Sequence, residues 1–500
     1  MQAGLEAVLS GRGWAQALIC GAIGGVAALG QAPFDLWPMT IIALGLLFTL
    51  LRNANSAKHA FGLGWAAGAG YFAVALMWLV EPFLVDVARH GWLAPIALSA
   101  ACAGFGFYWG ITGWLTYLCR GQAIAFIAAF TLTEVARGYV FTGFSWAQVG
   151  HVLIDTPLLH WASKGGPIVL TALVVLGGVG VTFLIQRHWL RGILCLAAIP
   201  VLYGAAVAAV PTIPVPDDAP FVRLVHPSEP QNERWDPEKI PANFERKLEY
   251  TAGDDDAKPD LVVWPETSVP TLLSRADPWF AAMTEASDGA PVVAGLQRFD
   301  GEDYFNSLIR LDGDAQVDAV YDKHHLVPFG EFMPFGDMLA RIGIFGLADT
   351  TGGGFAPGAG PQLIDFGPMG QALPIICYEG VFPRNVRIPG SRPDFILLIT
   401  NDAWFGEFSG PYQHLAQARL RSAEQGLPMI RVANTGVTAM IDATGRLTHQ
   451  MGLGEAGWID APLPPARPAT LYARIGDAPF IAIFLVLLAL SGFIARRRTS

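Results

Sequence analysis

Long apolar runs separated by short polar connections fill the first 210 residues of the chain, and one more such run lies near its end. A helix that crosses a bilayer needs about 20 mostly apolar residues. The pattern therefore predicts about eight spanning helices, seven before residue 211 and one near the C-terminus. They are expected at 14–30, 36–51, 61–80, 92–118, 123–141, 167–185, 193–210 and 480–495.

The pattern changes after the proline- and aspartate-rich stretch at 211–220, which is typical of a linker. Short apolar runs of strand length then alternate with longer runs that predict helices. Apolar strands interleaved with helices predict α/β layers. Strands are expected at 221–226, 261–266, 291–297, 306–312, 317–323, 373–377, 395–400, 429–434 and 438–443, and helices at 241–250, 275–287 and 414–425.

Composition supports a membrane protein with one water-soluble part. The mean hydropathy is +0.40, with 52% hydrophobic and only 15% charged residues. Residues 211–478 hold 20 of the 32 basic and 36 of the 42 acidic residues, a formal net charge of −16 for this segment. We therefore expect an N-terminal transmembrane domain at 1–210, an acidic domain at 211–478, and a C-terminal helix with a basic tail at 479–500. The acidic domain argues against a nucleic-acid partner.

Basic residues in the short connections predict the orientation, because cytoplasmic loops are enriched in Lys and Arg. With the N-terminus inside, nine basic residues fall inside and three fall outside. Seven crossings then place the acidic domain on the extracytoplasmic side, tethered at both ends. The inside set is Arg12, Arg52, Lys58, Arg120, Arg187, Arg191, Arg496, Arg497 and Arg498, and the outside set is Arg89, Arg137 and Lys164.

Three residues with useful chemistry end predicted strands of the acidic domain: Glu266, Lys323 and Cys377. Ligand crevices of α/β sheets lie at the carboxyl ends of strands, so these side chains can converge there. Cys377 is also the only cysteine between 211 and 478, in a compartment expected to be oxidising. Taken singly, such residues are more often a surface carboxylate, a solvated lysine and a core thiol. Their joint occurrence favours a site.

The three residue types suit nucleophilic catalysis by a thiol. A cysteine with an ordinary pKa of about 8.5 is mostly protonated near neutral pH and needs a base or a cation to react. Glu266 could accept the thiol proton and return it to a leaving group. Lys323 could stabilise the oxyanion of a tetrahedral intermediate, with the backbone N–H of Tyr378 as a second donor.

Three sequence strings, VVWPET (262–267), YDKHHLVPFGE (321–331) and ICYEG (376–380), resemble the nitrilase-type carbon-nitrogen hydrolases and their Glu-Lys-Cys triad. With the apolar spans on both sides, the whole chain is similar to the apolipoprotein N-acyltransferase family. The resemblance implies an α-helical membrane bundle joined to a nitrilase-like αββα sandwich. It also implies a location in the bacterial inner membrane, with the sandwich on the periplasmic side.

The resemblance implies roles for further residues and for partners. Glu266 would be the base, Lys323 the oxyanion lysine and Cys377 the nucleophile, with no cofactor or metal. The donor would be a phospholipid and the acceptor a diacylated apolipoprotein, joined through a thioester in a ping-pong reaction; we expect a monomer. Glu331, Glu379, Tyr378 and Asn306 match supporting positions, and Trp235 matches a position that lines the family's pocket.

An unusually apolar insertion at 329–348 lies between Lys323 and Cys377. Soluble domains seldom expose such a run, so we expect these loops to enter the bilayer surface and guide acyl chains. Phe335 and Phe345 would contact lipid, and Trp404 and Phe405 could line the same entrance. The alternative interpretation is a small satellite core.

Other readings of the chain remain open. A membrane-tethered nitrilase-type amidase would pass its acyl group to water, and product analysis separates it from a transferase. A transporter with a regulatory outer domain would need charges within several spans, and the sequence offers essentially only Glu134 and Arg137.

His324 and His325 suggest a metal site, but no set of Cys, His or carboxylate ligands at zinc-like spacing surrounds them in the sequence.

Overall fold

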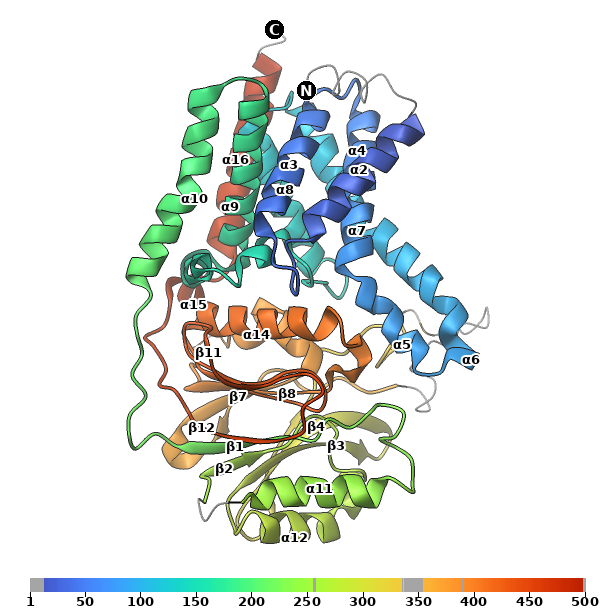
Figure 1. Cartoon of the computed structure of the whole chain (residues 1–500), viewed down its shortest axis with the longest axis vertical. Coiled ribbons are helices and arrows are strands. Elements are labelled where there is room, and N and C mark those ends of the chain that lie inside the picture. The colour runs from blue at the N-terminus through green and yellow to red at the C-terminus, as the bar shows by residue number, and fades with distance from the viewer. Residues whose placement is uncertain (1–12, 255–257, 335, 337–353, 389, 498–500) are drawn as a thin grey trace. The chain divides into compact units, whose positions relative to one another are not determined.

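The computed structural model describes residues 13–254, 258–334, 336, 354–388 and 390–497 (Figure 1). Contacts divide the chain into two compact units. The helical unit comprises Met1–Pro211, Phe408–Ala416 and Ala469–Ser500, and the sheet unit comprises Thr212–Glu407 and Gln417–Pro468. The short segment 408–416 thus groups with the helices, although the sequence pattern assigns it to the acidic domain.

Each of the eight apolar runs contains a helix. Among the described residues, four helical stretches are long and apolar enough to cross a membrane, and a bent pair counted as one span brings the number to five. The four are Val87–Leu118, Pro157–Ile185, Trp189–Ala209 and Ala478–Arg497. The helices are α2 (Gly13–Ala28), α3 (Trp37–Arg52), α4 (Ala57–Ala75), α7 (Ala94–Leu118), α8 (Ala123–Tyr139), α9 (Ala162–Ile185), α10 (Trp189–Ala209) and α16 (Ala478–Arg497).

The span expected at 61–80 is not continuous, because the helix breaks after Ala75. Helix α4 ends at Ala75, and a bend of 68° separates it from η1 (Met77–Val80) and α5 (Glu81–Leu84). Pro82 lies in the first turn of α5, where its missing N–H costs nothing, and it cannot continue the preceding helix. The short elements α6 (Val87–His90) and η2 (Gly91–Leu93) follow before α7 begins.

A buried ion pair lies inside the helical unit. Arg137 Nη2 of α8 is 2.9 Å from Glu134 Oε2, and both residues are almost fully buried. Trp109 Nε1 also donates to Glu134 (3.1 Å), and Arg137 donates to the carbonyl oxygens of Phe144 and Trp146. A buried ion pair is tolerated when further hydrogen bonds compensate its charges, and among the described residues only Arg137 Nε of this pair has no hydrogen-bond partner.

The sheet unit contains two six-stranded sheets. In the first, the order is β12 (Gly457–Pro462), β1 (Phe221–His226), β2 (Leu261–Val263), β3 (Val292–Asp300), β4 (Asp303–Leu311), β5 (Val317–Asp322). In the second, the order is β11 (Leu447–Met451), β10 (Thr438–Ile441), β9 (Met429–Ala433), β8 (Phe395–Thr400), β7 (Gln371–Ile376), β6 (Ile364–Asp365). The sequence pattern missed β6, which has two residues, and β11 and β12, whose residues are mostly not buried.

The directions of the strands determine which strand ends lie at the same edge of a sheet. Strands β1, β2 and β3 are parallel, whereas β4 is antiparallel to both β3 and β5. Strand β5 therefore runs in the same direction as β2, and their carboxyl ends lie at the same edge of the first sheet. Strands β7, β8 and β9 are parallel in the second sheet.

The layers of the sheet unit enclose apolar cores. Helices α11 (Ile240–Ala252) and α12 (Asp277–Ala286) cover the first sheet, and their residues Phe244, Phe280 and Met283 pack in one cluster with Trp264 (Figure 1). The two sheets lie against each other, with β1 beside β9 and β10 and β4 beside β7. Helix α14 (Gly410–Gln425) begins in the helical unit, and residues 417–425 belong to the sheet unit. This arrangement confirms the α/β layers expected for the acidic segment.

Candidate active site

Glu266 follows β2 in a short loop and is 6% exposed. The sequence pattern extended this strand to Glu266, but it ends at Val263, because Pro265 has no N–H to continue the ladder. Both carboxylate oxygens have donors. Asn306 Nδ2 donates to Oε1 (2.7 Å), and the backbone N–H of Asn401 donates to Oε2 (2.8 Å). The carboxylate is therefore fixed in orientation by two different sheets.

Lys323 directly follows β5, and its side chain is 1% exposed. Its ammonium lies 2.7 Å from Glu331 Oε1 and 3.6 Å from Glu266 Oε1. Burial alone lowers the pKa of this lysine, but the carboxylates of Glu331 and Glu266 outweigh it and raise the pKa above its usual value. Lys323 is therefore a permanent cation between two carboxylates. Its backbone N–H also donates to the carbonyl of Asn306 (2.9 Å).

Cys377 begins the turn η8 (Cys377–Val381) directly after β7 and is 5% exposed. Its φ of +50° lies in the left-handed region, which costs a residue with a side chain about 1–2 kcal/mol. This conformation lets the chain leave the strand at once and keeps the thiol at the strand tip. Burial and the negative charge of Glu266 raise the pKa of the thiol, whereas Lys323 and the Thr400 hydroxyl lower it. The net effect is a rise, so the resting site holds a protonated thiol near a carboxylate and an ammonium.

Glu379 connects the segment around Lys323 to the turn that carries Cys377. It is fully buried and accepts hydrogen bonds from the Tyr321 hydroxyl (2.8 Å), the His324 N–H (2.8 Å) and the Ile376 N–H (2.7 Å). Burial alone raises the pKa of this carboxyl group, but the His324 side chain and the backbone N–H groups of Ile376 and His324 lower it overall. Glu379 therefore holds the segment around Lys323 and the turn that begins at Cys377 in register.

Two residues that contact Glu266, namely Asn401 and Arg234, are not among the site residues predicted from the sequence. Asn401 follows β8, and its side chain is held by Gln231 (2.8 Å) and Asn434 (3.0 Å), so its backbone N–H is aimed at the carboxylate. Arg234 is buried and donates to the carbonyl oxygens of Glu266 and Thr267. Glu266, Lys323 and Cys377 were predicted because each ends a predicted strand, and Asn401 directly follows one as well.

The other predicted site residues differ in how closely they lie to these contacts. Asn306, on β4, also donates to Glu331 (3.1 Å), which joins two predicted supporting residues. The ring of Tyr378 is buried against His325 and Phe382. Trp235 and Trp404 are 47% and 38% exposed, whereas Phe405 is buried. Phe335 and Phe345 lie outside the described residues.

The three groups come from the ends of strands in two different sheets. Glu266 and Lys323 come from the first sheet, and Cys377 comes from the second. Because β5 runs parallel to β2, the carboxylate and the ammonium meet at one edge, and the tip of β7 brings the thiol to them. Such a set can remove a proton from sulfur and stabilise negative charge on a substrate oxygen.

Comparison with known proteins gives matches along most of the chain. A family model described as the apolipoprotein N-acyltransferase N-terminal domain matches residues 23–180, and one described as carbon-nitrogen hydrolase matches residues 230–471. The apolipoprotein N-acyltransferase of Rhodopseudomonas palustris is 33% identical over 97% of this chain and 96% of its own length. That of Caulobacter vibrioides is 34% identical, covering 97% and 94%. Among solved structures, a CN-hydrolase superfamily protein from Xanthomonas campestris matches with a TM-score of 0.37 and 21% identity, covering 54% of this chain and 97% of that one.

Proposed function

The chain belongs to the apolipoprotein N-acyltransferase family, and from this premise we propose that it acylates the N-terminal amine of bacterial lipoproteins. The acyl chain comes from a phospholipid, and the acceptor is the diacylglyceryl-cysteine of an apolipoprotein. The observation that carries the catalytic assignment is the position of Lys323, 3.6 Å from Glu266, with both charges acting on the thiol of Cys377. No cofactor is needed, because a thioester conserves the energy of the donor ester.

In the first half-reaction, the sulfur of Cys377 attacks the ester carbonyl carbon while its proton moves to Glu266. Lys323 stabilises the negative charge that develops on the carbonyl oxygen; one such donor is typically worth about 10²- to 10³-fold in rate. The intermediate then collapses, the bond to the glycerol oxygen breaks, and that oxygen takes the proton from Glu266. The products are a lysophospholipid and a thioester on Cys377.

In the second half-reaction, the amine of the lipoprotein attacks the thioester carbonyl. Glu266 takes a proton from the nitrogen, Lys323 again stabilises the oxyanion, and the carbon–sulfur bond breaks. The sulfur regains its proton from Glu266. An ester and an amine are thereby converted into an alcohol and an amide, with no net change in protons.

We also propose that all eight apolar helices cross the inner membrane and that the sheet unit faces the periplasm, with the chain acting as a monomer. The excess of basic residues in the connections assigned to the inside supports this orientation. The described part of the predicted insertion, residues 329–334, would meet the bilayer surface where acyl chains enter. The 56% exposure of the Phe329 side chain is consistent with that role.

A product assay tests the function. Purified full-length protein is incubated with a phospholipid carrying labelled acyl chains and with a diacylated lipopeptide. Label in an amide of the lipopeptide is expected, and it should disappear in Cys377→Ser but persist in the control Cys195→Ser, which changes a thiol of the helical unit. Label recovered only as free fatty acid would instead support a hydrolase.

A further inference from the structure

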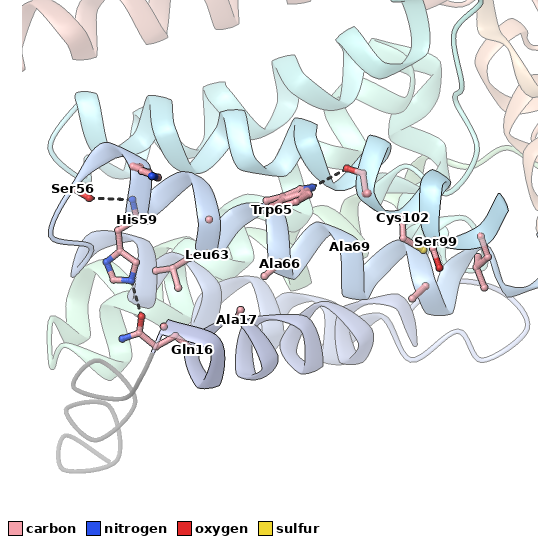
Figure 2. Close-up of a pocket in the computed structure, with 16 residues that line it drawn as sticks. Gln16, Ala17, Ser56, His59, Leu63, Trp65, Ala66, Ala69, Ser99 and Cys102 are labelled. Atoms are coloured by element: carbon pink, nitrogen blue, oxygen red, sulfur yellow. Dashed lines mark hydrogen bonds between the residues drawn. The ribbon is translucent and has the colours of Figure 1, made fainter. Parts of the chain in front are cut away.

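The helical unit has a hollow of about 880 Å³ between α2, α4 and α7. Figure 2 shows polar side chains gathered at one end of it, where His59 Nε2 donates to Gln16 Oε1 (2.8 Å) and Ser56 caps the start of α4. Lys58 also lines the hollow. None of these residues takes part in the acyl-transfer site described above.

The rest of this hollow is lined mainly by small and apolar side chains, including Ala66 and Ala69 (Figure 2) and Ala103. Its lining runs along α4 from Lys58 to Ala73, and at 1.5 Å per residue this is about 22 Å. The hydrocarbon core of a bilayer is about 30 Å thick, so one leaflet supplies about 15 Å. The hollow is therefore long enough for one extended acyl chain.

A second hollow of about 440 Å³ lies beside the first and is lined by Lys58, Phe61, Phe107, Ile111 and Trp114. Lys58 is the one residue that lines both hollows. Phe61 is held by edge contact with Phe107 at 5.4 Å between ring centroids, and it borders the second hollow. Two mainly apolar hollows thus share one basic residue in their lining.

The positive charge of Lys58, which lines both hollows, is available to bind an anion. Lys58 is exposed and forms no ion pair with a carboxylate in the described parts of the chain, and no described Asp or Glu lines either hollow. The first turn of the 19-residue helix α4 adds the positive end of a helix dipole at the same place. A glycerophospholipid carries one negatively charged phosphodiester and two acyl chains. It therefore matches a site with one cation and two apolar hollows.

We propose that this surface binds one glycerophospholipid, with its phosphate on Lys58 and one acyl chain in each hollow. The lipid belongs to the leaflet that meets the connection between α3 and α4. In the orientation proposed above, this is the cytoplasmic leaflet. The site binds its lipid without reacting with it, and the inference does not depend on the acyltransferase activity.

Native mass spectrometry of the full-length protein with added phosphatidylglycerol tests the site. Lys58→Ala should weaken lipid binding about fivefold, because one lysine near a membrane surface contributes about 1 kcal/mol, and Lys58→Glu should weaken it further. The matched control is Lys164→Ala, at an exposed lysine of α9 that lines neither hollow. Unchanged binding in Lys58→Ala and Lys58→Glu would overturn the assignment of the phosphate.

A second pair of variants tests the acyl positions. Ala103→Trp fills the first hollow from an exposed position of α7, and it should displace the lipid while the melting temperature shows that the protein still folds. Val207→Trp, at a 57% exposed position of α10, is the control and should bind normally. Displacement of the lipid by millimolar inorganic phosphate, or equal loss of phosphatidylglycerol and of an uncharged alkyl detergent in Lys58→Ala, would contradict the proposal.

Discussion

The ammonium of Lys323 lies 2.7 Å from Oε1 of Glu331. This distance is shorter than the 3.6 Å between the same ammonium and Glu266 Oε1. Glu331 is therefore the main counter-ion of the lysine. Glu266, whose closest donors are an amide side chain and a backbone N–H, is left able to take up a proton.

Glu331→Gln should lower kcat about 10- to 100-fold and leave the KM for phospholipid nearly unchanged. The amide still fills the space but loses the charge that holds and compensates Lys323, so the loss falls on the oxyanion of the transition state. Steady-state kinetics of the purified variant measure both constants. Glu302→Gln, in an exposed turn of the same unit, is the control, and wild-type kcat in Glu331→Gln would show that this counter-ion is dispensable.

Glu266→Gln should make the Cys377 thiol more acidic and yet lower the turnover of the enzyme. The carboxylate raises the pKa of Cys377, so its removal should shift the pH profile of Cys377 alkylation to lower pH. Turnover should nevertheless fall by about 10²- to 10⁴-fold, because the base is gone. Alkylation is followed on the Cys377 peptide by mass spectrometry across pH. A profile that moves to higher pH would contradict the electrostatic effect of Glu266 on the thiol, and a variant that still turns over normally would refute the role of Glu266 as the base.

Glu379→Gln should destabilise the sheet unit by about 2–3 kcal/mol, because one amide oxygen cannot replace a carboxylate that accepts from Tyr321, His324 and Ile376. The melting temperature should fall by several degrees. Tyr321→Phe removes only one of these donors and should cost less. If Tyr321→Phe were the more harmful of the two changes, Glu379 would not be the centre of this network.

The sheet unit should lose stability as the pH falls from about 6.5 to about 4. Burial lowers the pKa of His226 to about 4, and burial with the charge of Arg384 lowers that of His325 to about 4. Over this interval the unfolded chain binds protons that the folded chain does not, so each histidine contributes a loss on the order of 2 kcal/mol.

Melting temperatures measured across this interval check the effect. His226→Gln keeps a partner for Thr438, which lies 2.7 Å from His226 Nδ1, and it should make the melting temperature less dependent on pH. His449→Gln, at an exposed position of β11, is the control and should leave the dependence as it is. Equal pH dependence in the wild type and His226→Gln would show that His226 is not buried in its neutral form.

Much of the sheet unit could be predicted from local patterns. The strands that precede Lys323 and Cys377 are short, apolar and bounded by turns, and their carboxyl ends fall within one residue of the prediction. The helices of the other unit follow equally from long apolar runs. Their limits were less certain, as the break after Ala75 shows, because a helix end depends on packing as well as on composition.

What the sequence could not show is how the two sheets meet. Asn401 orients Glu266 through a backbone N–H, which every residue except proline carries, so its identity gives no signal for that contact. The hydrogen bond that Glu379 accepts from the His324 N–H likewise depends on the two sheets being packed together. Long-range contacts of this kind follow from the tertiary fold, which no local pattern encodes.

The central claim is that the sulfur of Cys377 carries the acyl chain. The most direct measurement is mass spectrometry of the full-length protein after exposure to phospholipid without acceptor, with peptide mapping of the adduct. We expect one added acyl chain on the Cys377 peptide, its loss on addition of diacylated lipopeptide, and no adduct in Cys377→Ala. An acyl chain on another residue, or on the Cys377→Ala protein, would contradict the mechanism.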